Sequence, residues 1–311
     1  MIRDLFQIGE RAEHRGIVVA PLFPRTDPVA EYLTLDEALA GGLRIRETSE
    51  AGSVPELLVE NPLAERVLLY DGEELVGAKQ NRILNVSVLV EAKTMVAIPV
   101  SCVEQGRWRH VSMAFGAGSH ISHAELRRRK AEAQAAQPLA RGVSQSEVWE
   151  AVHEKSVRMQ VSSPTGASSD IYRHYERDLR VLEDAFPAQP GQCGAIFGIG
   201  HDVCLDTVSR PDAFARLWPK LRAGYLLDAL ERLDGKSTSV AEIETFVVAV
   251  DGSLATRQAS AGLGEDVRLR GQSVIGSGLE LEGELIQLSA FRSEDGGRRA
   301  FGRIARPSRR R

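Results

Sequence analysis

The chain has 311 residues, of which 43% are hydrophobic and 26% are charged, and its formal net charge is −4. This composition is that of an ordinary globular protein and excludes an intrinsically disordered chain. The near balance of charge gives no global field that would favour nucleic acid or acidic membranes. The length suffices for one large domain or two intimately packed ones with a sizeable buried core.

The first hundred residues are predicted to be mainly β-strands, because short apolar or alternating runs are separated by turn residues. The predicted strands are 17–21, 32–35, 43–47, 56–60 and 66–70. One short helix interrupts them. Thr34 and Glu37 have the spacing of a capping box, and Gly41-Gly42 provides the stop.

A tight turn is predicted at Asp71-Gly72, between apolar runs at 67–69 and 75–76. Glycine and aspartate tolerate the positive φ that a two-residue primed turn requires, so the pattern predicts a β-hairpin. Residues 84–90 and 96–103 follow as strands of the core sheet.

The middle of the chain is predicted to be helical. Ser122 with Glu125, and Ser144 with Glu147, have capping-box spacing and predict helices to about residues 136 and 159. Residues 162–170 are predicted to be a mobile surface loop, because serine, Pro164 and Gly166 are frequent there. A further helix is expected from about 170 to 186.

Strands are expected again after the helices. Residues 194–200 and 203–208 are predicted to pair across a turn, and 245–250 and 284–291 to be strands. Between them, a helix begins at Pro211, carries an apolar face at helical spacing, and should kink or reset at Pro219.

These elements predict an α+β fold, with a mainly antiparallel β-sheet core from the N-terminal part, a helical middle and further strands toward the C-terminus. Residues 1–295 are expected to form a single α+β domain, or two intimately packed halves at 1–120 and 121–295. Residues 296–311 contain seven arginines and no acidic residue. They are expected to be a disordered basic tail, with binding to a polyanion as the minority interpretation.

Cytoplasmic localisation is expected. Residues 1–16 are charged throughout and lack the apolar core of a secretory signal, and no apolar run approaches the length of a membrane span. Three cysteines are too few for a disulfide framework.

The segment from Asp71 to Arg82 is the main candidate for a functional site. Six polar residues crowd together there: Glu73, Glu74, Lys79, Gln80, Asn81 and Arg82. Arg82 and Lys79 are suited to an anion, Gln80 and Asn81 to ribose or amide groups, and Glu74 to general acid–base chemistry. The alternative is a solvated hairpin with internal salt bridges. Amides at 80, 81 and 85, where an alternating strand prefers β-branched residues, favour a site or a buried hydrogen-bond network.

A second polar cluster, Cys102 to Trp108, follows a predicted core strand. Trp108 is suited to stacking on a base, Arg107 to binding phosphate and Glu104 to acid–base chemistry. Cys102 is a candidate nucleophile, although the spacing fixes no partner histidine and the commoner role is that of a small buried hydrophobe.

The glycine-rich stretch Phe115 to Ser119 precedes the helix expected at 122. Such a loop can present backbone N–H groups, and here Ser119, to a phosphate; the alternative is a mobile connector before a solvated basic helix face at 127–130. Cys193, His201 and Cys204 lack the spacing of a zinc site. We therefore predict no metal site and no cofactor.

Three blocks of the sequence resemble a prokaryotic family, the ARG and rhodanese-phosphatase-superfamily-associated proteins. The blocks are Leu69 to Arg82, Ile98 to Trp108, and Leu217 to Tyr225. The resemblance covers roughly Val54 to Leu230. The family name records association with ADP-ribosylglycohydrolases and rhodanese-like phosphatases, and it implies a role near NAD or ADP-ribose metabolism.

The resulting hypothesis is an enzyme or binding protein for an ADP-ribose-like or other phosphorylated nucleotide ligand. The residues expected to carry it are Glu74, Glu104 and Cys102 for catalysis, and Lys79, Gln80, Asn81, Arg82, Arg107, Trp108 and Ser119 for ligand binding. The expected partner is thus a small nucleotide-like molecule, with no membrane and no nucleic acid. The alternative is a non-catalytic scaffold or partner-binding protein whose polar cluster is a structural network.

Overall fold

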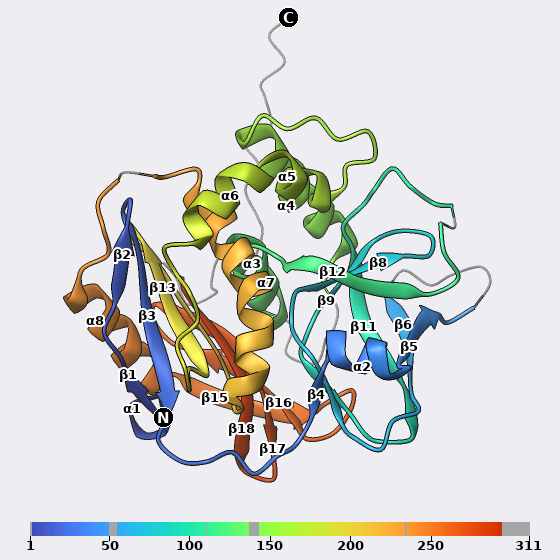
Figure 1. Cartoon of the computed structure of the whole chain (residues 1–311), viewed down its shortest axis with the longest axis horizontal. Coiled ribbons are helices and arrows are strands. Elements are labelled where there is room, and N and C mark those ends of the chain that lie inside the picture. The colour runs from blue at the N-terminus through green and yellow to red at the C-terminus, as the bar shows by residue number, and fades with distance from the viewer. Residues whose placement is uncertain (1, 50–54, 110, 137–142, 234, 294–311) are drawn as a thin grey trace, which may run out of the picture.

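The structure, a computed structural model, describes residues 2–49, 55–109, 111–136, 143–233 and 235–293 (Figure 1). The arginine-rich segment 296–311 lies outside these residues. The fold is α+β with almost entirely antiparallel sheets, which confirms the predicted class. Within the described residues, no helix has the length and apolar character that a bilayer span requires.

The largest sheet has nine strands and draws on both ends of the chain. Its order is β1-β3-β13-β14-β18-β17-β16-β15, with β2 on the outer side of β3. The strands are β1 (Phe6–Ile8), β2 (Ala12–His14), β3 (Ile17–Pro24), β13 (Gly194–Ile199), β14 (Asp202–Val208), β15 (Leu254–Ala259), β16 (Glu265–Arg270), β17 (Val274–Leu281) and β18 (Glu284–Arg292). The predicted hairpin between 194 and 208 is present, with Ile199 opposite Asp202.

Residues 33–121 build two smaller sheets beside the large one (Figure 1). Six strands run in the order β12-β8-β9-β11-β6-β5, and the end strands β5 and β12 contact each other, so the sheet curls on itself. Its strands are β5 (Arg44–Glu47), β6 (Glu56–Asn61), β8 (Glu73–Gly77), β9 (Arg82–Leu84), β11 (Thr94–Cys102) and β12 (Phe115–Ile121). The three-stranded sheet consists of β10 (Val88–Val90), β7 (Val67–Leu69) and β4 (Leu33–Thr34), with β4 parallel to β7.

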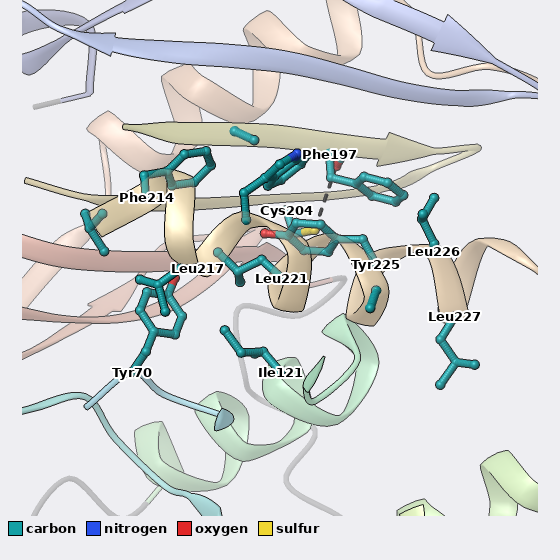
Figure 2. Packing of buried hydrophobic residues seen from close by; sticks show 14 of the residues in the cluster. Tyr70, Ile121, Phe197, Cys204, Phe214, Leu217, Leu221, Tyr225, Leu226 and Leu227 are labelled. Carbon is teal, nitrogen blue, oxygen red and sulfur yellow. Dashed lines mark hydrogen bonds between the residues drawn. The ribbon is translucent and has the colours of Figure 1, made fainter. Parts of the chain in front are cut away.

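The helices cover the large sheet and join it to the smaller ones. Helix α7 (Pro211–Ala229) packs on one face and contacts β12, while α1 (Ile2–Leu5) and α8 (Val240–Asp251) pack on the other face. The core around α7 contains Phe214, Leu217, Leu221 and Tyr225, as predicted from their spacing (Figure 2). The remaining helices are α2 (Leu35–Gly41), α3 (Ala124–Ala136), α4 (Gln145–Arg158), α5 (Ser168–His174) and α6 (Glu176–Glu183).

Four local predictions are wrong, and a fifth, at Pro219, is wrong in part. The strands flanking Asp71-Gly72 do not pair with each other: β7 pairs with β10 and β4, and β8 with β12 and β9. The stretch 115–119 is strand β12 and not a loop, residues 245–250 belong to α8, and the helix expected at 170–186 is divided into α5 and α6. Helix α7 continues through Pro219, so the helix is not reset there. The division of the chain into domains stays a prediction.

Candidate functional site

Strand β8 places two buried carboxylates on opposite faces. Glu73 accepts a hydrogen bond from the backbone N–H of Tyr70 (2.9 Å), and its Oε1 lies 3.3 Å from Lys220 Nζ. Glu74, the next residue, is 2% exposed and accepts a hydrogen bond from Asn81 Nδ2 (3.3 Å). Because neighbouring strand residues point to opposite faces, the two carboxyl groups lie in different environments.

A cavity of about 360 Å³ lies between the segment after β11 and the segment that leads into α5. Glu74 is not part of its lining and is connected to it by the hydrogen bond from Asn81, which lines the cavity. The two segments are joined by backbone hydrogen bonds, Gly106 N–H to Thr165 O (2.7 Å) and Ser168 N–H to Val103 O (2.9 Å). Its lining combines apolar and polar side chains: Val76, Asn81, Glu104, Arg107, Val111, Pro164, Thr165, Ala167, Ser169, Asp170 and Arg173. The cavity therefore brings together residues from both predicted clusters.

Glu74 holds a proton more tightly than an ordinary carboxyl. Burial raises its pKa from 4.5 to about 7; the hydrogen bond from Asn81 opposes this shift and the charge of Glu104 adds to it. A carboxyl with a pKa near neutrality can donate or accept a proton at physiological pH.

The pKa of Glu104 is shifted in the opposite direction. Burial acts to raise its pKa, but hydrogen bonds from Arg107, the backbone of Asn81 and Thr165, together with the charge of Arg107, lower the pKa below 4.5. The Arg107 Nε lies 2.8 Å from Glu104 Oε2, and the Asn81 backbone N–H lies 3.2 Å from the same oxygen. Asn81 thus contacts both carboxylates, one of which is fixed in its ionised form.

The Arg107 guanidinium is already occupied by groups of the protein. Besides Glu104, it donates to the backbone oxygens of Ala78 (2.9 Å) and Arg109 (3.2 Å) and to Asn81 Oδ1 (2.9 Å). A guanidinium has five N–H donors, so little capacity remains for a ligand.

His120, on β12, is the unexpected partner of Glu74. Its Nε2 lies 3.4 Å from Glu74 Oε2, and its ring stacks on Tyr172 with centroids 3.5 Å apart. Burial, with the nearby charges of His123 and Lys220, lowers its pKa to about 3, so the imidazole is neutral and the contact with Glu74 is not an ion pair at neutral pH. The Nδ1 atom is buried without a hydrogen-bond partner among the described residues.

The absence of a side chain at Gly118 leaves the space that Glu74 occupies. A Cβ atom at position 118 would lie 2.7 Å from Glu74 Cβ and 3.0 Å from its backbone oxygen. We expect Gly118→Ala to lower the free energy of unfolding by about 1–3 kcal/mol, because overpacking forces neighbouring groups to shift. Urea denaturation measures this change.

Gly116 on the same strand is the matched control, because a Cβ there meets nothing within 4 Å. Gly116→Ala should be neutral or slightly stabilising, by roughly 0.4–1 kcal/mol. Equal losses in both variants would contradict the close packing of Gly118 against Glu74.

A buried hydrogen-bonded group lies next to Glu104, outside the cavity lining, and consists of Gln80, Arg82 and Cys102. Gln80 Oε1 accepts from Arg82 Nη1 (2.9 Å) and lies 2.9 Å from Cys102 Sγ, while its Nε2 donates to Glu104 O (2.8 Å). Arg82 is 0% exposed, and its Nη2 lies 3.8 Å from Glu47 Oε1. Burial raises the pKa of the Cys102 thiol, so the thiol form prevails and nucleophilic reactivity is low.

The remaining predicted residues lie toward the surface. Trp108 is half exposed, with Lys79 Nζ 5.4 Å and Arg82 Cζ 5.7 Å from its ring centre. Ser119 is exposed on β12, outside the described lining of the cavity.

Asp71 belongs to a different, fully buried network. It pairs with Lys130 (2.7 Å), and Arg127 makes a two-pronged contact with Asp206 (2.9 and 2.6 Å). Arg127 and Lys130 are therefore interior residues, which corrects the interpretation of residues 127–130 as a solvated basic face. This network joins the small sheets, α3 and the large sheet.

Four residues of the site were absent from the sequence prediction: His120, Thr165, Asp170 and Arg173. His120 lies on a stretch whose glycines predicted a loop. The other three lie in or next to the stretch predicted to be a mobile surface loop. Only long-range contacts bring them to Glu74 and Glu104, and no local spacing predicts those contacts.

A second cavity of about 430 Å³ lies between α3, the end of α7 and the large sheet. Among the described residues, His123, Glu125 and Asp228 place three potential metal ligands within 4.8 Å of one another at this place. Lys155 Nζ lies 2.7 Å from Asp228 Oδ1, so an ammonium group already supplies positive charge there.

The comparisons with known proteins agree with the resemblance in the sequence. A sequence profile described as the ARG and rhodanese-phosphatase-superfamily-associated protein domain matches residues 6–291. Neither the curated proteins nor the solved structures contain a match.

Proposed function

The chain belongs to the ARG and rhodanese-phosphatase-superfamily-associated protein family, and on that premise we propose that the cavity beside Glu74 binds an ADP-ribose-like or other phosphorylated nucleotide ligand and acts on it by proton transfer. The family name supplies the class of ligand. The chemistry is inferred from the side chains that surround the cavity.

The observation that carries the proposal is the pairing of Glu74 with Glu104. Their pKa values are shifted in opposite directions, and both carboxylates contact Asn81. Two carboxyl groups with separated pKa values are the usual arrangement for a general acid and an ionised partner at one site. Glu104, which lines the cavity, would stabilise developing positive charge or activate water, and Glu74, buried behind Asn81, is our candidate for the proton donor to a leaving oxygen or nitrogen.

Ligand binding is proposed to use cavity residues whose side chains can still form further contacts with a ligand. Arg173 lines the cavity and pairs with Asp170 (2.7 Å), but its side chain is 74% exposed and has further N–H donors, so it is our candidate for phosphate. Ser169 and Asp170 would take sugar hydroxyls, and Val76 and Val111 offer an apolar surface to a base. We propose that a buried group of three side chains, Arg82, Gln80 and Cys102, holds Asn81 and Glu104 in position.

Ligand-dependent thermal stability tests the proposal. We expect ADP-ribose to stabilise the protein by ~2.7 kcal/mol at a concentration 100 times its dissociation constant. Arg173→Ala should weaken that binding because it removes the cationic side chain that is our candidate for phosphate. The shift in midpoint temperature over a series of ligand concentrations gives the affinity.

Arg177→Ala is the control, since Arg177 is an exposed arginine of the neighbouring helix α6. It should bind ADP-ribose as the unmodified protein does. If millimolar ADP-ribose, NAD and related nucleotides leave the unmodified protein unchanged, the proposed ligand class is wrong.

A non-catalytic scaffold is the second candidate, and the saturation of the polar cluster favours it. Arg107 and the group of Gln80, Arg82 and Cys102 use their hydrogen bonds within the protein. A scaffold would show a loss of stability in Asn81→Ala without any effect of nucleotides on either protein.

A further inference from the structure

Two apolar side chains, Val76 and Val111, line the Glu74 cavity, and two exposed ones, Trp108 and Met113, stand within three residues of Val111 in the chain. Met113 is 86% exposed and Val111 is 56% exposed. Trp108 is half exposed, and Val76 on β8 lines the cavity together with Val111. We call these four residues the rim patch. Apolar side chains that gather at one place on a surface mark an interaction site, whereas single ones are common anywhere.

The described residues of the segment that carries most of the rim patch, 107–109 and 111–114, are hydrogen-bonded to the body of the protein. The Val111 backbone N–H donates to Ala78 O (3.0 Å), and Ser112 Oγ accepts from Ala78 N–H (2.8 Å) and donates to Ala114 O (2.7 Å). Arg107, at its other end, contacts the oxygens of Ala78 and Arg109. A surface that is already ordered loses less conformational entropy when a partner binds, so exposed side chains here are well placed for binding.

Cationic side chains border the rim patch. Arg109 is exposed one residue after Trp108, and Lys79 Nζ lies 5.4 Å from the Trp108 ring centre. Arg173 lines the cavity with a largely exposed side chain that also pairs with Asp170 (2.7 Å), so Arg109 and Lys79 supply most of the positive charge. This charge is complementary to an acidic partner.

We propose that the rim patch docks an acidic polypeptide segment with apolar side chains, and that the nucleotide-like group entering the cavity is attached to this polypeptide. The nature of the attached group rests on the proposed function. A polypeptide is favoured over nucleic acid because bases stack on aromatic rings, and three of the four side chains are aliphatic.

Binding of four probes to three proteins tests this inference. The probes are free ADP-ribose, a fluorescent peptide of alternating glutamate and leucine that carries one ADP-ribosyl group, the same peptide without that group, and a uridine oligonucleotide of equal length. The proteins are the unmodified chain, Arg109→Ser with Met113→Ser, and the control Arg180→Ser with Val181→Ser. The control pair is also an exposed arginine and an exposed apolar residue, on α6.

We expect the Arg109/Met113 double variant to bind the modified peptide about tenfold more weakly, because hot-spot side chains of an interface each contribute above ~1 kcal/mol. Free ADP-ribose should bind all three proteins equally. Equal binding of the modified peptide by all three proteins, or binding of the oligonucleotide that depends on Met113, would overturn the inference.

The same data separate this inference from the proposed function. If neither ADP-ribosyl probe gains affinity from its ADP-ribosyl group, the proposed ligand class fails. The docking surface would then be tested by the unmodified peptide alone. It is supported if the unmodified protein and the control bind this peptide and the Arg109/Met113 double variant does not, and it is overturned if none of the three proteins binds it.

Discussion

Replacing Arg127 with methionine should lower the free energy of unfolding by about 3–5 kcal/mol, because the change leaves the buried carboxylate of Asp206 without its counter-charge. Arg127 is 1% exposed and contacts Asp206 through both terminal nitrogens. Its Nε also lies 3.6 Å from Asp71 Oδ2. Domains of this kind have a total stability of only about 5–15 kcal/mol, so the variant should be close to unfolding at 37 °C. Urea denaturation followed by circular dichroism measures the loss.

The size of this effect follows from how many groups converge on Asp206. Tyr70 OH donates to its Oδ1 (2.5 Å), Ser289 Oγ donates to the same atom (2.5 Å), and Tyr225 OH donates to Oδ2. Arg127 also lies over the rings of Tyr70 (5.5 Å) and Phe291 (5.4 Å). Removal of the guanidinium therefore disturbs residues of the small sheets, α7 and the large sheet at once.

Arg129 on the same helix provides the control. It is only partly buried and pairs with Glu125 and Glu154 near the surface, so Arg129→Met should cost less than about 1 kcal/mol. Adding Asp206→Asn to Arg127→Met should recover part of the loss, because the stranded charge is then removed. An Arg127→Met protein as stable as Arg129→Met would show that the interior network contributes little to the fold.

The contrast between Asp71 and Glu74 shows how far the sequence determines the site. Both lie in one polar segment, and the sequence predicted one shared function for them. The turn at Gly72, with φ of 81°, is present, and Glu73 N–H donates to Tyr70 O (3.1 Å) as in a β-turn. The strands on either side nevertheless join different sheets, so the segment serves two places. Local turn chemistry predicts a turn but cannot predict which strands pair.

Helix α8 shows a second limit. Thr245–Val250 is rich in β-branched and aromatic residues and was predicted to be a strand. The capping box of Ser239 with Glu242, in which Ser239 Oγ accepts from Glu242 N–H, begins a helix five residues earlier. Ile243, Phe246, Val247 and Val250 then recur at helical spacing on its buried face. Tertiary burial of that face outweighs the strand propensity of the individual residues.

The pairing of Glu74 with Glu104 was predictable only in part. Both were candidates for acid–base chemistry because carboxylates stood next to amides and an arginine. Their opposite pKa shifts depend on the burial of Glu74, against which Gly118 and His120 of β12 pack, and on hydrogen bonds to Glu104, one of them from Thr165 in the segment before α5. Gly118, His120 and Thr165 lie 44 to 91 positions away from Glu74 in the chain, so the sequence alone identifies the two carboxyl groups but not the order of their proton affinities.

Glu74 should make the stability of the protein fall as the pH rises from about 5 to about 8. Its pKa is about 7 in the folded protein and 4.5 in the unfolded chain, so the folded state binds more protons between these values. Below 4.5 both states are protonated and the stabilising contribution is complete. Each pH unit between the two values removes ~1.4 kcal/mol, and the loss from pH 5 to pH 8 should be ~2.5 kcal/mol. In Glu74→Gln, which cannot titrate, this part of the pH dependence should disappear.

Urea denaturation of both proteins across this range isolates Glu74, because all other titrating groups cancel in the difference between them. Glu104→Gln gives a second, smaller effect. The folded pKa of Glu104 lies below 4.5, so its own contribution is lost only as the pH falls further. Because the charge of Glu104 helps to raise the pKa of Glu74, the curve of Glu104→Gln should fall from pH 5 to pH 8 in the same direction as that of the unmodified protein but by a smaller amount. If the curve of Glu74→Gln runs parallel to that of the unmodified protein, Glu74 is ionised throughout, and the proposed proton donor is lost.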